Sequence, residues 1–234
     1  MYYKIAGLIV AMEPQYPPLI DQLDAYKIKE KPQTIDCKIP NDKKVIERYQ
    51  AKNPELTVGE AEYLLYGAYY YDALLQHQGI FLHASCVVYK GHAYLFSANS
   101  GVGKSTHTNL WCQAFPSAFI LNDDKPALKI EGDKLFAYGT PFSGKTNKNV
   151  NASYPVAGIA FIERSKNNTI KEISILDALI LFMGQTMKPY KEERLDLMSE
   201  TLDKLLLMTK FYSLTINMEE DAVLTAYQAM KPNK

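Results

Sequence analysis

The sequence predicts a mixed α/β fold, and three observations support this class. Short apolar runs of strand length are interleaved with longer amphipathic runs of helical length. A β-rich stretch occupies the middle of the chain, and helical patterns dominate its end. The 234 residues are 47% hydrophobic and 22% charged, which is enough to bury one large core or one core with a small lobe.

Residues 1–56 are expected to form a small N-terminal α+β lobe, and 57–234 the main domain with a helical C-terminal tail. Within the lobe, 3–12 and 34–39 have the pattern of strands, and prolines break the segments between them. The lobe is otherwise expected to be irregular.

A long helix is expected after this lobe. Thr57 and Glu60 have the spacing of a capping box, and the apolar run that follows reaches His77 and ends at Gly79. Tyrosines recur at helical spacing along this run, which is typical of core packing. They are Tyr63, Tyr66 and Tyr70.

The remaining elements follow from alternation, turn residues and caps. Strands are expected at 80–89, 92–97, 119–121, 127–130, 134–138, 156–162 and 211–216. Helices are expected at 104–114, from Ser174, at 190–208, and from a cap at Asn217 to a point before Pro232.

Charge and hydropathy exclude two classes of partner. Lys plus Arg number 26 and Asp plus Glu number 26, so the net charge is zero, unlike that of basic nucleic-acid binders or polybasic membrane-surface proteins. No apolar run approaches the roughly 20 residues of a membrane-spanning helix. Three cysteines without a CxxC pair are typical of a reducing compartment. We therefore expect a cytoplasmic protein.

The most specific motif is a glycine-rich segment, ANSGVGKST, between a predicted strand and a predicted helix. This context predicts a phosphate-binding loop (P-loop), whose backbone N–H groups and helix N-terminus hold phosphate. Lys104 would contact the β- and γ-phosphates of ATP, and the Ser105 hydroxyl would bind Mg²⁺. Ala98 stands where the full pattern has glycine, so its backbone is either ordinary or strained. The predicted nucleotide-binding residues are Ser100, Gly101, Val102, Gly103, Lys104, Ser105 and Thr106.

Two adjacent carboxylates, Asp123 and Asp124, end the next predicted strand. One could hold Mg²⁺ while the other takes a proton, although Asn122-Asp123-Asp124 is also a favourable turn sequence. Lys145 follows a glycine-rich turn, so it either stabilises the charge of the transferred group or is a solvated loop lysine.

Several other polar residues have two readings. His107 in the first turn of the P-loop helix fits the helix surface or the flank of a nucleotide better than catalysis. Glu163 and Arg164 end a predicted strand, where functional charges gather in open α/β sheets. The alternating Asn147, Asn149 and Asn151 would form a polar lip if extended, or are ordinary loop residues.

Four segments in order then carry a family resemblance: Leu82-His83-Ala84-Ser85, the P-loop, the Asp123-Asp124 pair, and GTPFSGK at 139–145. Over about 81–164 the chain resembles the HPr kinase/phosphorylase family, whose P-loop core is shared with phosphoenolpyruvate carboxykinase. It looks most like the small HPr-kinase-like proteins of bacteria, some of which accompany peptide-modification gene sets. The resemblance implies such a core here, with the small N-terminal lobe and the helical tail added.

The resemblance implies a Mg-ATP-dependent kinase that acts on a serine hydroxyl of a peptide or protein. Carried over, Lys104 and Ser105 hold phosphate and metal, Asp123 is a metal ligand and Asp124 is the base, with His83 close by. A homo-oligomer is also consistent with the resemblance. The lobe is shorter than in true HPr kinase/phosphorylases and their downstream signature is lacking, so neither HPr nor a phosphorylase activity is implied.

Two alternatives stay open. The protein could phosphorylate a free amino acid or another small metabolite. It could also be a non-catalytic nucleotide-binding partner or regulatory protein of a peptide-modification system, which Ala98 favours and the lysine and both aspartates oppose.

Overall fold

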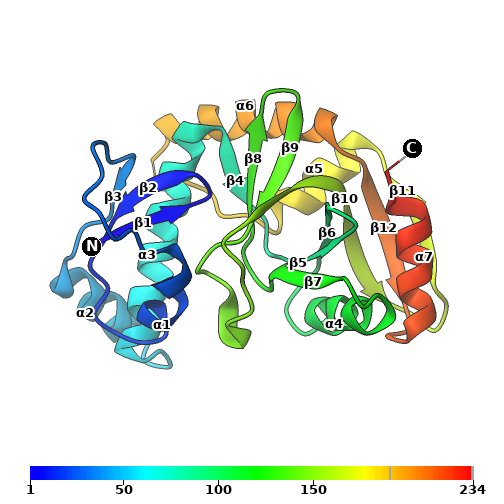
Figure 1. Cartoon of the computed structure of the whole chain (residues 1–234), viewed down its shortest axis with the longest axis horizontal. Helices are drawn as coiled ribbons and strands as arrows, with labels where there is room; N and C mark the ends of the chain where they lie inside the picture. The colour runs from blue at the N-terminus through cyan, green and yellow to red at the C-terminus, as the bar shows by residue number, and fades with distance from the viewer. Residues whose placement is uncertain (190, 233–234) are drawn as a thin grey trace.

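A curled, mixed sheet runs through the centre of the protein (Figure 1). The computed structural model describes residues 1–189 and 191–232, and within them the sheet has nine strands. Seven follow the order β4-β8-β9-β10-β6-β5-β7, and β12 pairs with β10 and β11. Their bounds are β4 Gly79–Phe81, β5 Ala84–Tyr89, β6 His92–Ser97, β7 Phe119–Asn122, β8 Ala127–Glu131, β9 Lys134–Tyr138, β10 Ser153–Arg164, β11 Thr169–Glu172 and β12 Phe211–Ile216.

Strand β10 joins two parts of the sheet. Its first three residues pair antiparallel with β9, whereas Ile159–Arg164 pair parallel with β12 on one side. Parallel pairing with β6 includes a register shift between Val156 and Gly158. The resulting parallel order β6-β10-β12 lies beside the loop that follows β6.

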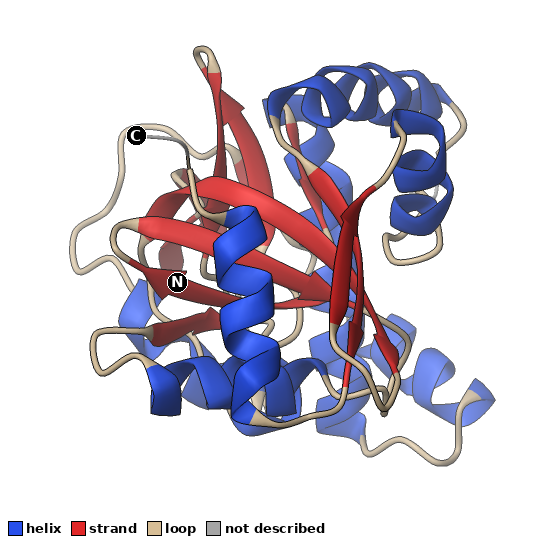
Figure 2. Cartoon of the chain, turned by 90° about the vertical axis from the view of Figure 1, so that its right-hand side faces the viewer, coloured by secondary structure: helices blue, strands red, loops and turns tan. Residues whose placement is uncertain are grey.

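Helices cover both faces of this sheet, as the alternation of its buried residues requires. Cys86, Leu95 and Ile159 pack with α5 (Ile175–Met183) and α6 (Glu193–Met208). Their neighbours along the same strands face α4 (Lys104–Ala114) and α7 (Glu220–Met230). Figure 2 shows α7 against its face of the sheet. The mixed α/β class predicted from the sequence is therefore what the structure shows.

The N-terminal part lies on the left of Figure 1 and packs against α3. The single strand expected at 3–12 is wrong, because Ala6 and Gly7 adopt positive φ angles of 48° and 79° and turn the chain into a hairpin. Of the strand expected at 34–39, only the two residues Cys37–Lys38 are in a strand. The elements are β1 Tyr2–Ile5, β2 Leu8–Ala11, α1 Leu19–Leu23, η1 Asp24–Tyr26, β3 Cys37–Lys38, α2 Lys43–Lys52, α3 Val58–Leu74 and η2 Leu75–His77.

The capping box of α3 is confirmed: Thr57 Oγ1 accepts from the Glu60 N–H, and Glu60 accepts in return from the Thr57 N–H. Ile46 of α2 and Tyr70 of α3 belong to the same buried cluster. Apolar contacts thus cross the boundary expected after residue 56, which itself stays a prediction.

Three local expectations for the main domain are corrected. The strand expected at 80–89 is interrupted at Leu82-His83, β11 was not expected, and Asn217 does not cap α7. The Asn217 side chain accepts instead from the Glu219 N–H and forms a turn. Position 190, where a helix was expected to begin, lies outside the described residues.

The described ranges 1–189 and 191–232 contain no helix that is both long and apolar enough to cross a membrane. Cys37, Cys86 and Cys112 are free thiols.

Candidate functional site

The glycine-rich loop connects β6 to α4, as expected. Gly101 and Gly103 have φ angles of 81° and 121°, in the region that favours glycine. Ala98 does not have a positive φ angle, so its backbone avoids the left-handed region that favours glycine. Gly103 is the N-cap of α4 and no side chain caps the helix, which leaves its first N–H groups free to bind an anion.

Lys104 folds back over this loop. Its side chain is buried, and Nζ donates to the Ala98 carbonyl at 2.8 Å. Burial lowers the pKa of Lys104, while the charges of Asp124 and Asp123 oppose that shift. The lysine thus lies between the loop carbonyls and the two carboxylates.

Asp123 is a buried carboxylate held by two hydroxyl groups. Ser85 Oγ donates to Oδ1 at 2.6 Å and Thr146 Oγ1 donates to Oδ2 at 2.9 Å. Ser85 Oγ also contacts Thr108 Oγ1 of α4 at 2.7 Å. These bonds join β5, α4 and the segment 144–146 around one acidic group, and they satisfy its hydrogen-bonding needs on burial.

Asp124 is paired on both oxygens. Oδ1 lies 3.1 Å from His83 Nε2, and Oδ2 forms an ion pair with Lys125. Burial raises the pKa of Asp124, but the hydrogen bond from His83 and the charge of Lys125 outweigh it and hold the pKa below its ordinary value. Asp124 is therefore ionised at neutral pH.

Asn122 shapes the backbone of this acidic pair. Its side-chain carbonyl accepts from the N–H groups of Asp124 at 2.9 Å and Lys125 at 2.7 Å. The favourable turn sequence and the acidic site are therefore the same feature, since the turn positions the carboxylates.

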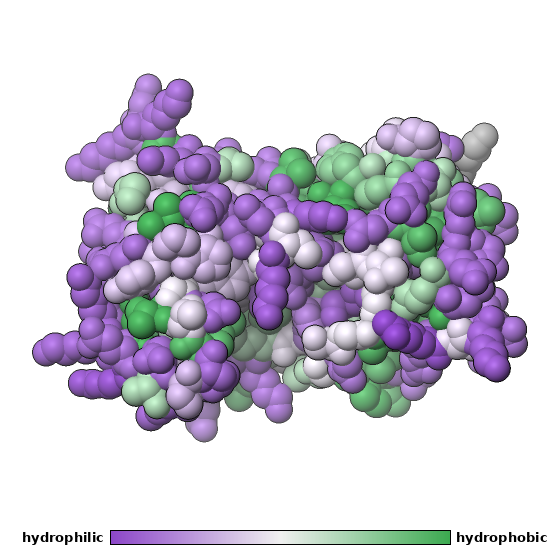
Figure 3. Space-filling model, turned by 90° about the horizontal axis from the view of Figure 1, so that it is seen from below, coloured by the Kyte–Doolittle hydropathy of each residue, from purple (hydrophilic) through white to green (hydrophobic). Residues whose placement is uncertain are grey.

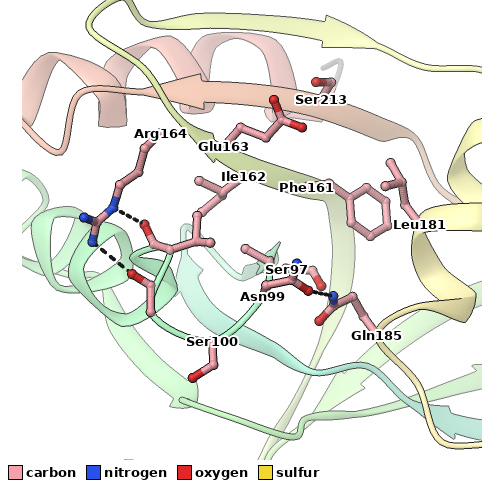
Figure 4. A pocket seen from close by; sticks show the side chains of 13 residues that line it. Ser97, Asn99, Ser100, Phe161, Ile162, Glu163, Arg164, Leu181, Gln185 and Ser213 are labelled. Carbon is pink, nitrogen blue, oxygen red and sulfur yellow. Dashed lines mark hydrogen bonds between the residues drawn. The ribbon is translucent and has the colours of Figure 1, made fainter.

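A loop after α5 reaches the site through Gln185. Its Oε1 lies 3.2 Å from His83 Nδ1. Its Nε2 donates to Asn99 Oδ1 at 2.8 Å, as Figure 4 shows. Gln185 therefore links the histidine beside Asp124 to the P-loop.

Arg164 fixes the outer side of the loop, donating to the carbonyls of Val102 at 2.6 Å and Gly101 at 3.0 Å (Figure 4). Met218 lies against Gly103, where a Cβ would come within 2.1 Å of the methionine methyl group. The end of β10 and the turn before α7 thus hold the loop in shape.

Two cavities flank the P-loop. The first, of about 280 Å³, is the phosphate cleft. Its lining residues are His83, Ser100, Gly101, Gly103, Lys104, Ser105, Thr106, Asp123, Asp124 and Arg164. The second, of about 520 Å³, lies between the loop, the end of β10, Ser213 of β12, and α5, where Leu181 and Phe161 lie beside one another (Figure 4).

The helix that lines the larger cavity also presents apolar side chains to solvent. Leu176 and Ile180 of α5 are 65% and 63% exposed. Elsewhere, the face drawn in Figure 3 is mostly hydrophilic, with separate hydrophobic areas between the polar ones.

The predicted residues of the P-loop, His83 and both aspartates therefore meet in one cleft, apart from Val102, which lines the larger cavity. Lys145 does not line the cleft: it is exposed, and after the stronger effect of Thr57 its charge helps to lower the pKa of Glu60 at the start of α3. Its catalytic role stays a prediction.

His107 is neither on the helix surface nor beside a nucleotide site. It is fully buried, and its Nε2 accepts from Trp111 Nε1 at 3.1 Å. Asn149 and Asn151 bond Tyr26 and the Ala25 carbonyl, so they attach their segment to η1 rather than form a lip.

Sequence reasoning missed three contributors to the site. Ser85 ends the Leu82-His83-Ala84-Ser85 segment, but no role was predicted for its side chain. Thr146 directly follows Lys145. Gln185 stands in a loop with no local pattern, so only the fold reveals it.

Comparisons with known proteins give distant structural likenesses only. No family model matches the sequence, and no curated protein matches it. The solved structure of the Hpr(Ser) kinase/phosphatase from Coxiella burnetii is similar at 12% identity and a TM-score of 0.38, covering 64% of this chain and 93% of that one.

Proposed function

We propose that this protein is a Mg-ATP-dependent kinase that transfers the γ-phosphate to a hydroxyl group, in particular a serine of a peptide or protein. One observation carries the proposal: a single cleft brings together a glycine-rich loop, the Lys104 ammonium and two aspartates from the next strand along the chain. Phosphoryl transfer needs mainly this kind of positioning and charge neutralisation.

The loop supplies the phosphate site. The uncapped N–H groups at the start of α4 would donate to a phosphate oxygen, and the helix dipole favours negative charge there. Lys104 would exchange its bond to the Ala98 carbonyl for one to a phosphate oxygen. The larger cavity at the other side of the loop is the place that we propose for the nucleoside.

The residues present fit Mg²⁺. Ser105 and Asp123 offer the hard oxygen ligands that this ion takes, and it usually binds one or two carboxylates together with phosphates and water. Within the described part of the chain, no group of three or more His, Cys, Asp or Glu residues is placed to hold a metal without such help. When bound, Mg²⁺ neutralises charge on the phosphates.

Asp124 would accept the proton of the attacking hydroxyl. Its lowered pKa makes it a weak base, which suits a loose transition state in which the proton leaves late. His83 and Lys125 position it by holding one carboxylate oxygen each.

The test combines binding and transfer. With Mg-ATP at about 100 times Kd, the wild type should gain about 2.7 kcal/mol of stability, seen as a thermal shift of several degrees. Transfer is followed with γ-labelled ATP and a mixture of synthetic serine peptides. Lys104→Ala should lose both signals, and Asp124→Asn should keep the shift while transfer falls by about 10²–10⁴-fold.

Asp133→Asn, in the β8–β9 turn, is the matched control and should retain both signals. Unchanged transfer in Asp124→Asn would remove that residue from the base role. If neither Mg-ATP nor a non-hydrolysable analogue shifts the wild type, the nucleotide site itself is refuted.

A further inference from the structure

A third cavity, the aromatic pocket, lies beside the catalytic centre but outside the phosphate cleft. It has a volume of about 170 Å³ and lies between α2, α3 and the core of the main domain. Five residues of α3 line it, and Lys125 lines its polar end. Three aromatic rings, those of Tyr63, Tyr71 and Phe142, form much of its wall.

Asp124 separates this pocket from the phosphate cleft. The carboxylate lines the cleft, while Lys125, its ion-pair partner, lines the pocket. Gly144 packs on Asp124 so closely that a Cβ there would lie 3.0 Å from the aspartate Cβ. The same glycine donates its N–H to Tyr63 Oη at 3.0 Å. A hydroxyl held at Asp124 would therefore have the aromatic pocket immediately beside it.

Two tyrosine hydroxyls of the pocket walls, those of Tyr63 and Tyr71, are already paired. Tyr63 Oη accepts from Gly144, and Tyr71 Oη donates to the Lys125 carbonyl at 2.7 Å and contacts Thr140 Oγ1 at 3.1 Å. What remains open is aromatic and aliphatic surface, formed partly by the packed rings of Tyr63, Tyr71 and Phe142.

The volume matches one apolar side chain. An apolar cavity of about 150 Å³ is large enough to bind benzene. A pocket of about 170 Å³ therefore accepts one aromatic ring or one branched aliphatic group, but not a folded partner.

We infer that the aromatic pocket binds an aromatic or large aliphatic side chain of a peptide acceptor, from the residue next to the phosphorylated serine. This inference rests on the proposed kinase function and names its substrate class. It excludes free serine as the preferred acceptor, because that molecule has no group to fill the pocket. Lys125 holds Asp124 at the boundary between the serine and its apolar neighbour.

The test uses blocked synthetic peptides with one serine and Gly elsewhere, in which the residue before or after serine is Phe, Leu, Gly or Glu. In wild type, kcat/KM for the Phe or Leu peptide should exceed that of the Gly peptide by at least about 10-fold, the lower end for hydrophobic pockets. Ala68→Leu enlarges a side chain in the pocket wall and should reduce this preference, measured as the ratio of the two kcat/KM values, to about 2-fold.

Ala51→Leu, the same change at an exposed position of α2, is the control and should keep the preference. Binding is measured separately, by NMR titration of the nucleotide-free protein with N-acetyl-phenylalaninamide and with N-acetyl-glycinamide. Wild type and Ala51→Leu should bind only the first, and Ala68→Leu should bind neither. Thermal melting confirms that all three proteins are folded.

Equal rates for the Gly and Phe peptides, or faster labelling of free serine, would overturn the inference while leaving the kinase function intact. Retention of the preference in a folded Ala68→Leu protein would also overturn it. If nothing is phosphorylated and Mg-ATP gives no thermal shift, the proposed function fails instead. Binding of the phenylalanine amide without any transfer would show an apolar site that serves no acceptor, which contradicts the inference too.

Discussion

The phosphate cleft and the aromatic pocket lie on opposite sides of Asp124, yet they are built in different ways. The cleft is made largely of one short segment, residues 100, 101 and 103–106, and its binding groups are backbone N–H groups with a few side chains. The pocket collects side chains from positions 49 to 187, and its surface is aromatic. A site for a constant group such as phosphate depends on local backbone shape, whereas a site that selects a partner depends on long-range packing.

The largest effect should come from the backbone of the cleft. Gly103→Ala places a side chain at a φ of 121° and a Cβ against Met218, so both strain and crowding disturb the loop. We expect ATP affinity to fall by about 100-fold, or about 2.7 kcal/mol, in equilibrium titrations. Gly91→Ala also introduces Ala at a positive φ, 76°, but meets no neighbour, and its affinity should stay unchanged. Equal losses in the two variants would show that the effect is general instability.

Mg²⁺ binding in the cleft should also depend on Thr146, a side chain that does not line the cleft. Thr146→Val removes the hydroxyl that bonds Asp123, while Lys145→Ala removes a neighbouring side chain that does not line the cleft. Loss of a group that orients a metal ligand typically costs about 10–100-fold in metal affinity. We expect the Mg²⁺ concentration for half-maximal activity to rise by this factor in Thr146→Val only. A larger effect of Lys145→Ala would instead support a role for Lys145 in the site.

The stability of the protein should depend on pH through His107 of α4, the helix that follows the P-loop. Burial lowers the pKa of His107 to about 4, below its value of about 6.5 in the unfolded chain. The unfolded state therefore takes up a proton first as the pH falls, and stability present above pH 6.5 is lost toward pH 4. Between pH 7 and 5 the free energy of unfolding should drop by about 2 kcal/mol.

Urea titrations of wild type and His107→Gln at both pH values test this, because glutamine can still accept from Trp111 but does not titrate. The variant should lose this part of the pH dependence. The lowered pKa of Asp124 acts in the same direction but only at more acidic pH, below its ordinary value near 4. An identical pH dependence in both proteins would contradict the assignment to His107.

The smallest effect concerns the pocket. Tyr63→Phe removes the acceptor of the Gly144 N–H and keeps the ring, so stability should fall by about 0.5–1.5 kcal/mol in urea unfolding. Tyr69→Phe, on the same helix but not lining the pocket, should change stability less. If Tyr63→Phe is neutral, water replaces the lost bond and the pocket wall does not depend on it.

The same contrast explains what the sequence could reveal. The P-loop, the 104–114 helix and the Thr57–Glu60 capping box are local patterns, and each was predicted with its position. Helix α2 was not predicted because its apolar stripe is short: only Ile46 is fully buried, with Val45 and Tyr49 partly buried beside it. The turn at Ala6-Gly7 was hidden inside an apolar run.

In the candidate site, local reasoning selected the acidic pair and His83 but could not supply their partners. Ser85 lies 38 residues before Asp123, and Gln185 lies 102 residues after His83. These contacts result from how β5, β7 and the loop after α5 pack together, and no spacing rule encodes them. Lys145 was selected and Thr146 was not considered, because charge is visible in a sequence and side-chain orientation is not.

Strand β10 has one further consequence. It is hydrogen-bonded to β9 at its start and to β12 at its end. One continuous strand therefore connects the half that holds the aromatic pocket to the half that holds the P-loop. Any rotation of one half relative to the other must bend β10. A bend in β10 disrupts the fewest hydrogen bonds at the register shift between Val156 and Gly158. The strand should therefore bend at this point.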